Sequence, residues 1–242
     1  MINETYLAAS KYTNSPHIMK KLKVLLGMLV AFLPIIVLGT IGTVLDGGTL
    51  LGGMLINLGY VLSILITGIM LKRQGSSWRD IGLVRPKSWL RTIVLVIGTV
   101  IALTAISLAI LNIAQLIPGA AGINVSRYNP LQGNLPLLLL YILLAWTTIT
   151  FGEEMMYRAF LITQLGEIFQ GAKLRWVLAL IFSSVIFGLI HFYQGPLGIV
   201  NTFLVGILFG AVYLRSERNL WITIIAHGLF NTLSFVLMFY GI

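Results

Sequence analysis

The sequence contains no cysteine, so it offers no disulfide framework, no thiol nucleophile and no thiolate metal site. It is also poor in charge, because Asp, Glu, Lys and Arg together make up only 10% of its 242 residues. A soluble domain carries about a quarter of charged residues. Apolar residues make up 58% of this chain. So few charges cannot cover a globular surface in water, and the composition therefore predicts an integral membrane protein.

Long apolar stretches recur along the whole chain, and a membrane-spanning helix needs about 20 such residues. Seven stretches qualify or come close, at about 22–45, 50–71, 92–117, 135–152, 174–194, 197–214 and 220–240. The fourth continues without a helix breaker into the polar but helix-compatible sequence GEEMMYRAFLITQLGEIF. Short segments of alternating polarity, typical of membrane β-strands, do not occur. We predict an all-α fold, a polytopic membrane helical bundle with seven or eight transmembrane helices.

The basic residues are unevenly divided between the predicted connections. If the N-terminus is cytoplasmic, fifteen of the sixteen Lys and Arg residues fall inside, and only Arg127 falls outside. The inside residues are Lys11, Lys20, Lys21, Lys23, Lys72, Arg73, Arg79, Arg85, Lys87, Arg91, Arg158, Lys173, Arg175, Arg215 and Arg218. This division follows the positive-inside rule and predicts a cytoplasmic N-terminus. The net charge of +9 is therefore interpreted as a topology signal, and no nucleic-acid partner is expected.

Ionisable side chains within a span are informative because each costs about 2.5–3.5 kcal/mol on insertion scales. On a helix, Glu154 and Arg158 are four residues apart, share one face and can neutralise each other. Glu153 points about 100° away from them and lacks that partner, as a general base would. The same three residues could instead lie in water at a cytoplasmic helix end, and the motif alone leaves both readings open.

Two histidines lie within later apolar stretches. His191 follows Phe187 by four residues, and His227 precedes Asn231 by one helical turn. Packing for the first pair and a helix–helix hydrogen bond for the second are the simpler explanations. In an antiparallel hairpin, however, Glu153 and His191 would each lie roughly 27–30 Å from the turn, at nearly the same level. His227 would lie only roughly 15 Å from the turn near Glu217, so the levels agree if the 153–190 hairpin protrudes some 10–15 Å into the cytosol. The sequence thus permits one site inside the membrane, near the cytoplasmic side.

The motifs EExxxR, FxxxH and HxxxN, in this order, resemble those of the CAAX-protease and bacteriocin-processing family of intramembrane proteases, also called CPBP or Abi. The matching residues are Glu153, Glu154, Arg158, Phe187, His191, His227 and Asn231, and the resemblance covers about 135–240. It implies an intramembrane endopeptidase, dependent on glutamate or metal, that hydrolyses a peptide bond of a membrane-associated protein or peptide. CAAX-type, bacteriocin and signalling-peptide processing are the activities known in such a family.

The resemblance also implies a role for each matching residue. Glu153 would be the general base and would act with His191 to activate water, while His227 and Asn231 would stabilise the oxyanion. Glu154 and Arg158 would hold the catalytic site in shape. His191, His227 and Glu153 could also bind Zn²⁺ as a cofactor, which would lower the pKa of a bound water towards ~7. Without a metal, Glu153 could still act, because a low-dielectric setting raises a carboxylate pKa.

We expect one integral membrane domain with two regions. Residues 1–134 would form an N-terminal region with three transmembrane helices and a cytoplasmic amphipathic loop, and residues 135–242 a catalytic core of about four helices. The expected location is the cell membrane of a bacterium, by family analogy, with the active site towards the cytoplasmic side. The expected partners are the lipid bilayer and a membrane-associated substrate. Gly206 and Gly210, four residues apart, could serve packing within the chain or a homodimer.

Two other functions are compatible with the same residues. A proton-coupled transporter could use Glu153, Arg158 and the two histidines as a relay. A non-catalytic immunity or scaffold protein could keep the fold without the activity. A serine-type mechanism is less consistent with the spacing, since Ser183 and Ser184 lie about 11–12 Å along the helix from His191.

Overall fold

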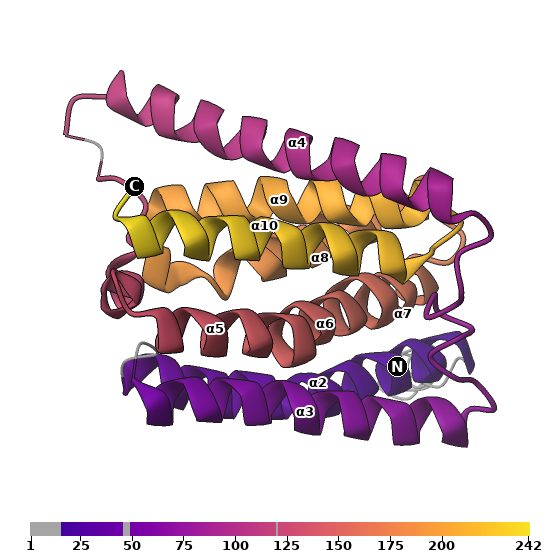
Figure 1. The fold of residues 1–242 in the computed structure, drawn as a ribbon. Coiled ribbons are helices and arrows are strands. Elements are labelled where there is room, and N and C mark those ends of the chain that lie inside the picture. The colour runs from indigo at the N-terminus through magenta and orange to yellow at the C-terminus, as the bar shows by residue number, and fades with distance from the viewer. Residues whose placement is uncertain (1–15, 46–48, 120) are drawn as a thin grey trace, which may run out of the picture.

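The computed structural model describes residues 16–45, 49–119 and 121–242, so Lys11 lies outside the described residues. Helices account for all regular structure in these ranges, which confirms the predicted all-α fold (Figure 1). In chain order the elements are α2 (Pro16–Val44), α3 (Leu50–Arg73), α4 (Trp89–Gln115), η1 (Ser126–Leu131), α5 (Leu135–Leu144), η2 (Ala145–Ile149), α6 (Thr150–Glu153), η3 (Glu154–Leu161), α7 (Ile162–Ile168), α8 (Arg175–Leu189), η4 (Phe192–Gln194), α9 (Gly195–Arg215) and α10 (Leu220–Tyr240).

Six helical stretches of the described chain are long and apolar enough to cross a membrane, instead of the seven or eight predicted. They are Ile18–Val44, Leu50–Arg73, Trp89–Gln115, Leu135–Ile168, Phe192–Arg215 and Leu220–Tyr240. The predicted span 174–194 is the exception, because its helix α8 has only 15 residues. At 1.5 Å per residue it is about 22 Å long, against about 30 Å of hydrocarbon. The chain turns after α8 through η4, and Gly195 follows with a positive φ of 79°.

The helical stretch Leu135–Ile168 continues from the apolar fourth span into the polar sequence without a break, so the polar part forms no separate eighth span. Two π-helical segments, η2 and η3, interrupt its α-helical geometry. Every residue of η3 is buried, although this segment contains a glutamate and an arginine. Wide π-helical turns are rare and occur frequently at functional sites. The π-helical geometry therefore favours a functional role for the EExxxR motif.

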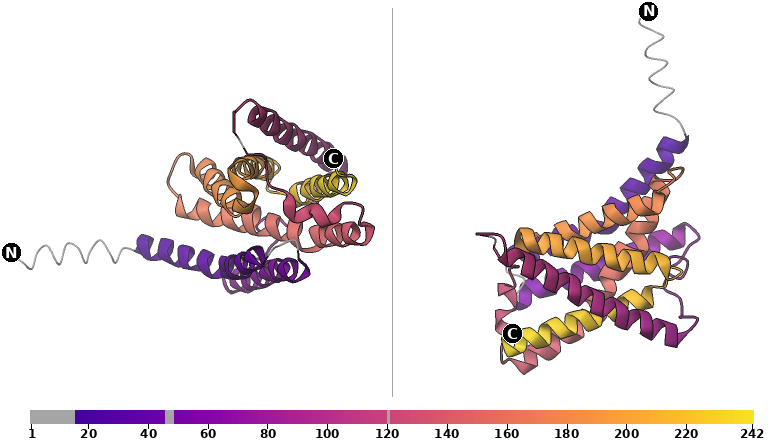
Figure 2. Two further views of the ribbon diagram at one scale, coloured as in Figure 1. Left: turned by 90° about the vertical axis from the view of Figure 1, so that its left-hand side faces the viewer. Right: turned by 90° about the horizontal axis from the view of Figure 1, so that it is seen from above.

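The helices form layers that place the first three helices on both sides of the remaining ones (Figures 1 and 2). Helix α4 packs on α9 and α10, whereas α2 and α3 pair with each other and contact the α5–α7 stretch on the opposite side. Helix α8 packs on α9. Glycines allow this last contact, since a Cβ atom on Gly210 would lie 2.3 Å from Leu180 Cδ1 and one on Gly206 3.1 Å from Ser184 Cβ. Gly206 and Gly210 thus pack within the chain.

The connections 72–91, 169–175 and 215–219 meet at one end of the bundle, on the right in Figure 1. Hydrogen bonds join the 72–91 connection to the chain on either side of 215–219, including Leu220 N to Gly82 O (3.0 Å) and Tyr213 Oη to Ile81 O (2.8 Å). Most of the predicted cytoplasmic cations therefore share one end. Arg158 does not, because it is 1% exposed inside the bundle. Its inclusion among the topology-marking residues was wrong, and the orientation of the bundle in the membrane stays a prediction.

Candidate active site

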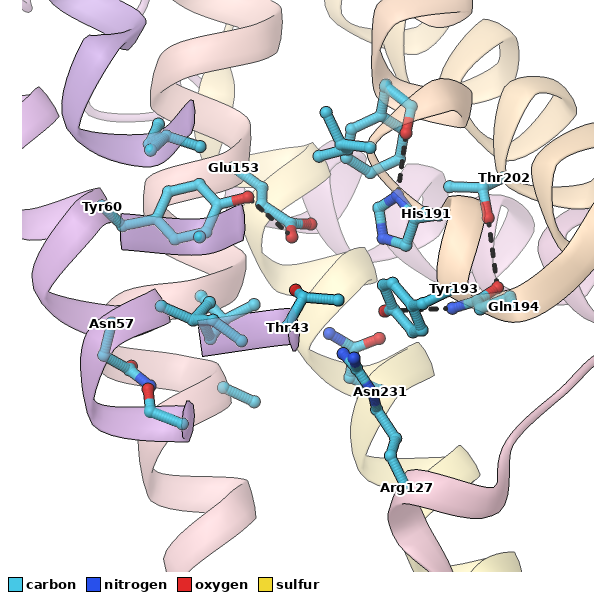
Figure 3. Close-up of a pocket in the computed structure, with 18 of the residues that line it drawn as sticks. Thr43, Asn57, Tyr60, Arg127, Glu153, His191, Tyr193, Gln194, Thr202 and Asn231 are labelled. Carbon is cyan, nitrogen blue, oxygen red and sulfur yellow. Dashed lines mark hydrogen bonds between the residues drawn. The ribbon is translucent and has the colours of Figure 1, made fainter. Parts of the chain in front are cut away.

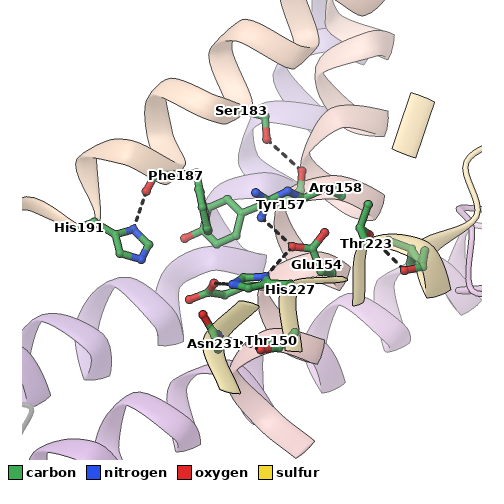
Figure 4. Close-up of polar contacts among 12 residues, drawn as sticks. Thr150, Glu154, Tyr157, Arg158, Ser183, Phe187, His191, Thr223, His227 and Asn231 are labelled. Atoms are coloured by element: carbon green, nitrogen blue, oxygen red, sulfur yellow. Dashed lines mark hydrogen bonds and ion pairs between the residues drawn. The ribbon is translucent and has the colours of Figure 1, made fainter. Parts of the chain in front are cut away.

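The predicted pair of Glu154 and Arg158 forms, and it lies in the interior of the bundle (Figure 4). Arg158 Nη1 lies 3.1 Å from Glu154 Oε1, and the two residues are 1% and 0% exposed. The alternative that these residues lie in water at a helix end is thereby excluded. Removing one member of a buried pair leaves an uncompensated charge, so the two side chains stabilise the fold only together.

The guanidinium of Arg158 is also enclosed by aromatic rings. Its Cζ atom lies 4.1 Å from the ring centroid of Phe187 and 5.1 Å from that of Phe209. The Phe209 ring in turn contacts the imidazole of His227, with centroids 4.8 Å apart. These contacts give Arg158 a fixed position between the helices that carry the predicted site, and they favour a positioning role for it.

His227 lies between the two adjacent glutamates. Its Nδ1 is 2.9 Å from Glu154 Oε1, and its Nε2 is 3.6 Å from Glu153 Oε2. The first distance is that of a hydrogen bond, and since the carboxylate can only accept, Nδ1 carries the proton. The second distance is too long for a direct hydrogen bond. His227 is therefore oriented by Glu154, and its other nitrogen faces Glu153.

Glu153 has a different environment from Glu154, as the sequence predicts. It receives a hydrogen bond of 3.1 Å from the hydroxyl of Tyr60, a residue of α3 (Figure 3). Among the described residues it has no arginine partner, and it is 6% exposed towards a cavity. One carboxylate of the pair is thus neutralised by a guanidinium, and the other reaches the cavity surface.

His191 lies just beyond the end of α8 rather than within a helix, in the turn that leads into η4. Its Nδ1 is 2.8 Å from the carbonyl oxygen of Phe187. Because a carbonyl oxygen only accepts, Nδ1 carries a proton, and in the neutral imidazole Nε2 then keeps its lone pair. The predicted FxxxH contact also forms, with the two rings in an edge arrangement 4.9 Å apart. His191 is therefore held in a form that can accept a proton.

Asn231 is one turn beyond His227 on α10, and its Nδ2 donates to Thr150 Oγ1 at 3.1 Å. An amide nitrogen has two N–H groups, so one remains for another acceptor. Figure 4 shows Asn231 and Thr150 below His227 and Glu154. The hydrogen bond to Thr150 fixes the orientation of the amide, and this suits a side chain that has to present its second N–H to a ligand.

Four of the six predicted site residues line one cavity of about 1070 Å³. They are Glu153, His191, His227 and Asn231, whereas Glu154 and Arg158 lie behind the cavity wall. The cavity is lined mainly by apolar side chains, with a few convergent polar groups, as is typical of ligand sites. It also reaches Thr43, Asn57 and Arg127, towards the end of the bundle opposite the basic connections (Figure 3).

Tyr60 contacts Glu153 but is not among the residues predicted from the sequence, because all of those lie in the region 135–242. A pattern that could have found it is present on the same helix. Asn57, Tyr60, Ser63 and Thr67 are spaced three or four residues apart within an apolar run, so they share one face. Ser63, Tyr60 and Thr67 are buried in the bundle. A polar stripe on a transmembrane helix thus indicates the face that meets the interior.

The predicted zinc ligands, Glu153, His191 and His227, all line the same cavity. Among the described residues, no three His, Cys, Asp or Glu side chains lie close enough to hold one ion. His191 and His227 both use Nδ1 for other hydrogen bonds, to Phe187 and Glu154. The Nε2 atoms of both histidines are left for another partner, and the need for Zn²⁺ stays a prediction.

A comparison with protein families bears on the resemblance carried by the motifs. A family model described as "Type II CAAX prenyl endopeptidase Rce1-like" matches residues 135–233, and this segment contains all six predicted site residues. Comparisons with curated proteins and with solved structures find no match. The resemblance carried by the three motifs is thus confirmed: over residues 135–233 this chain is similar to the Rce1-like CAAX prenyl endopeptidases, a family of proteases.

Proposed function

We propose that this protein is an intramembrane endopeptidase that cleaves a membrane-associated protein or peptide with a water molecule activated by Glu153 and His191. The proposed substrate is a CAAX-type, bacteriocin or signalling peptide. The observation that carries the proposal is the placing of Glu153, His191, His227 and Asn231 around one cavity, inside a bundle of membrane-length helices. Hydrolysis needs a base that activates water and hydrogen-bond donors that stabilise the oxyanion, and these four side chains can supply both.

In the first step, Glu153 takes a proton from water while the water oxygen bonds to the scissile carbonyl carbon. Tyr60 orients this carboxylate through its hydrogen bond. The lone pair on His191 Nε2 faces the same cavity and accepts a hydrogen bond from the water. The carbonyl oxygen becomes negative and accepts hydrogen bonds from His227 and Asn231. In the second step, the carbon–nitrogen bond breaks and the proton on Glu153 passes to the departing amine.

The charges of the buried residues are compatible with Glu153 as the base and His227 as a donor to the oxyanion. Glu153 and Glu154 contribute two negative charges and Arg158 one positive charge, so a protonated His227 brings the group to neutrality. Neutrality matters because an uncompensated charge in a low-dielectric interior is costly. A protonated His227 donates from Nδ1 to Glu154 and presents an N–H on Nε2 to the oxyanion.

The depth of the site follows from the helix that carries His227. This residue is seven positions beyond the first residue of α10, Leu220, and hence about 10 Å along the helix from the basic end of the bundle. With the basic end in the cytoplasm, the scissile bond lies in the cytoplasmic half of the membrane. By family analogy, we propose that this membrane is the cell membrane of a bacterium.

The test uses purified protein in detergent and an N-terminally acylated random peptide library, with products read by mass spectrometry. Wild type cleaves peptides, whereas Glu153→Gln, which keeps an acceptor for Tyr60, loses at least about 100-fold in rate. Glu167→Gln is the matched control, because Glu167 is exposed and pairs with Lys20 at the surface. Full activity of Glu153→Gln would contradict the assigned role. Elemental analysis of the same preparation tests for bound zinc.

An assay of solute uptake into liposomes distinguishes a proton-coupled transporter from a protease. Proton-driven solute uptake by wild type that is lost in Glu153→Gln, without cleavage of any peptide, would favour a transporter and reject the protease.

A further inference from the structure

Arg127 differs from the other basic residues of the described chain in position. It belongs to η1, in the connection between α4 and α5, at the end of the bundle opposite the basic connections. Its side chain is half-buried and lines the cavity that contains Glu153 and His191. Figure 3 shows it extending from its loop towards Tyr193 and Asn231. A cation at this location contributes nothing to the positive-inside pattern, so another reason for its presence is needed.

The guanidinium of Arg127 lies over the ring of Tyr193, with Cζ 3.4 Å from the ring centroid. Tyr193 is itself anchored, because its hydroxyl accepts a hydrogen bond of 3.2 Å from Gln194 Nε2. The loop before η1 is tied to the same place, since Asn124 N donates to Gln194 O at 2.9 Å. The cation is therefore held in one place at the cavity wall by a stacked ring and an anchored loop.

Stacking uses the face of the guanidinium and leaves its edge available. An arginine has five N–H donors in one plane, and their geometry matches both oxygens of a carboxylate. Within the described ranges, the ion pairs formed by Asp and Glu side chains do not include Arg127. A fixed, half-buried cation with a free edge in a cavity is suited to bind an anionic group of a ligand.

The distance between Arg127 and the catalytic residues limits which part of a peptide it can reach. The rings of Tyr193 and His191 have centroids 5.8 Å apart, and Arg127 lies 3.4 Å beyond the first of them. The guanidinium is therefore at most about 9 Å from the His191 ring. An extended chain advances about 3.3–3.6 Å per residue, so two or three residues cover this distance.

We propose that Arg127 and Tyr193 form a subsite for a carboxylate of the substrate, two or three residues from the scissile bond. This inference rests on the proposed protease function and specifies its substrate. The carboxylate can be the C-terminus of the peptide or the side chain of Asp or Glu, because both present the same planar pair of oxygens. Arg127 determines specificity by binding this group and takes no part in the bond-breaking step.

The experiment compares two acylated random peptide libraries that differ only at the C-terminus, one with a free carboxylate and one with a carboxamide. Initial rates and cleavage positions are measured for wild type, Arg127→Gln and Arg127→Lys. Arg79→Gln is the matched control, because Arg79 is an exposed arginine in the 72–91 connection. Wild type and the control prefer peptides that carry the carboxylate, at the C-terminus or in an acidic side chain, by about tenfold or more, the gain expected for a charge-assisted hydrogen bond. Arg127→Gln loses this preference through a higher KM, and Arg127→Lys keeps part of it.

The pattern of preference identifies the source of the carboxylate. Faster cleavage of the carboxylate library identifies the chain end, whereas equal rates with Asp or Glu enriched two or three residues from the cut identify a side chain. Either result supports the subsite if Arg127→Gln abolishes it. Equal treatment of both libraries without acidic enrichment, or an unchanged preference in Arg127→Gln, would overturn it.

A binding measurement keeps the inference separate from the activity. Immobilised Glu153→Gln protein, with and without the Arg127→Gln change, is exposed to both libraries, and the retained peptides are identified. Retention of carboxylate peptides that depends on Arg127 supports the subsite even if no preparation cleaves a peptide. In that case the proposed protease function fails and the subsite stands. Retention that does not depend on Arg127 overturns the subsite alone.

Discussion

Replacement of Arg158 by methionine should destabilise the protein strongly, because it removes the guanidinium that neutralises Glu154 in the interior of the bundle. The two charged groups are 3.1 Å apart and both residues are almost fully buried. At an effective dielectric constant of about 20, Coulomb's law gives roughly 5 kcal/mol for such a pair. Measured losses on breaking buried pairs are about 3–5 kcal/mol. We therefore expect Arg158→Met to lower the free energy of unfolding by about 3–5 kcal/mol.

The assay is unfolding in detergent micelles, followed by intrinsic tryptophan fluorescence, for a double-mutant cycle. Glu154→Gln combined with Arg158→Met should recover a large part of the loss, because the unpaired carboxylate is then absent. Lys20→Met is the matched control, since its ion pair with Glu167 is exposed and should contribute less than about 1 kcal/mol. Additive effects of the two single substitutions would refute the reasoning, because they would mean that the buried charges do not depend on each other.

Two further predictions concern Tyr60 and Gly210. Tyr60→Phe removes the hydrogen bond to the Glu153 carboxylate and should lower kcat/KM for peptide cleavage by about tenfold to hundredfold, the value of a bond to a charged group; an unchanged kcat/KM would mean that Tyr60 does not orient the base. Gly210→Val adds side-chain atoms where a Cβ would already lie 2.3 Å from Leu180, and should lower the unfolding free energy by about 1–3 kcal/mol. Gly98→Val, with no neighbouring atom within 4 Å of an added Cβ, is its control.

The parts of the site that could be predicted from sequence are those governed by local helix geometry. The spacing of Glu154 and Arg158 predicts their ion pair, and the spacing of Phe187 and His191 predicts their contact. Both contacts form between residues four apart in sequence, whatever the rest of the chain does. The end of α8 at Leu189 could not be predicted in this way. The turn carries the polar residues of HFYQG, at 191–195, but polar residues also occur inside a span at a functional site, so composition alone does not distinguish the two.

Contacts between distant helices could not be derived from local patterns. Tyr60 meets Glu153 across 93 residues of sequence, and His227 meets Glu154 across 73. Which faces of α3, α6 and α10 meet depends on the packing of the whole bundle, and two π-helical segments also shift the faces of the helix that carries the glutamates. A regular 100° rotation per residue is therefore only approximate there.

The arrangement separates the charges that hold the site from the one proposed to react. Glu154 and Arg158 neutralise each other behind the cavity wall, and Glu154 also orients His227. Glu153 alone of the two glutamates reaches the cavity, with a tyrosine hydroxyl as its donor and an imidazole nearby. If both carboxylates faced the cavity, a bound substrate would have to remove water from two charges. With only one exposed, the cost of excluding water is confined to the carboxylate that is proposed to act as the base.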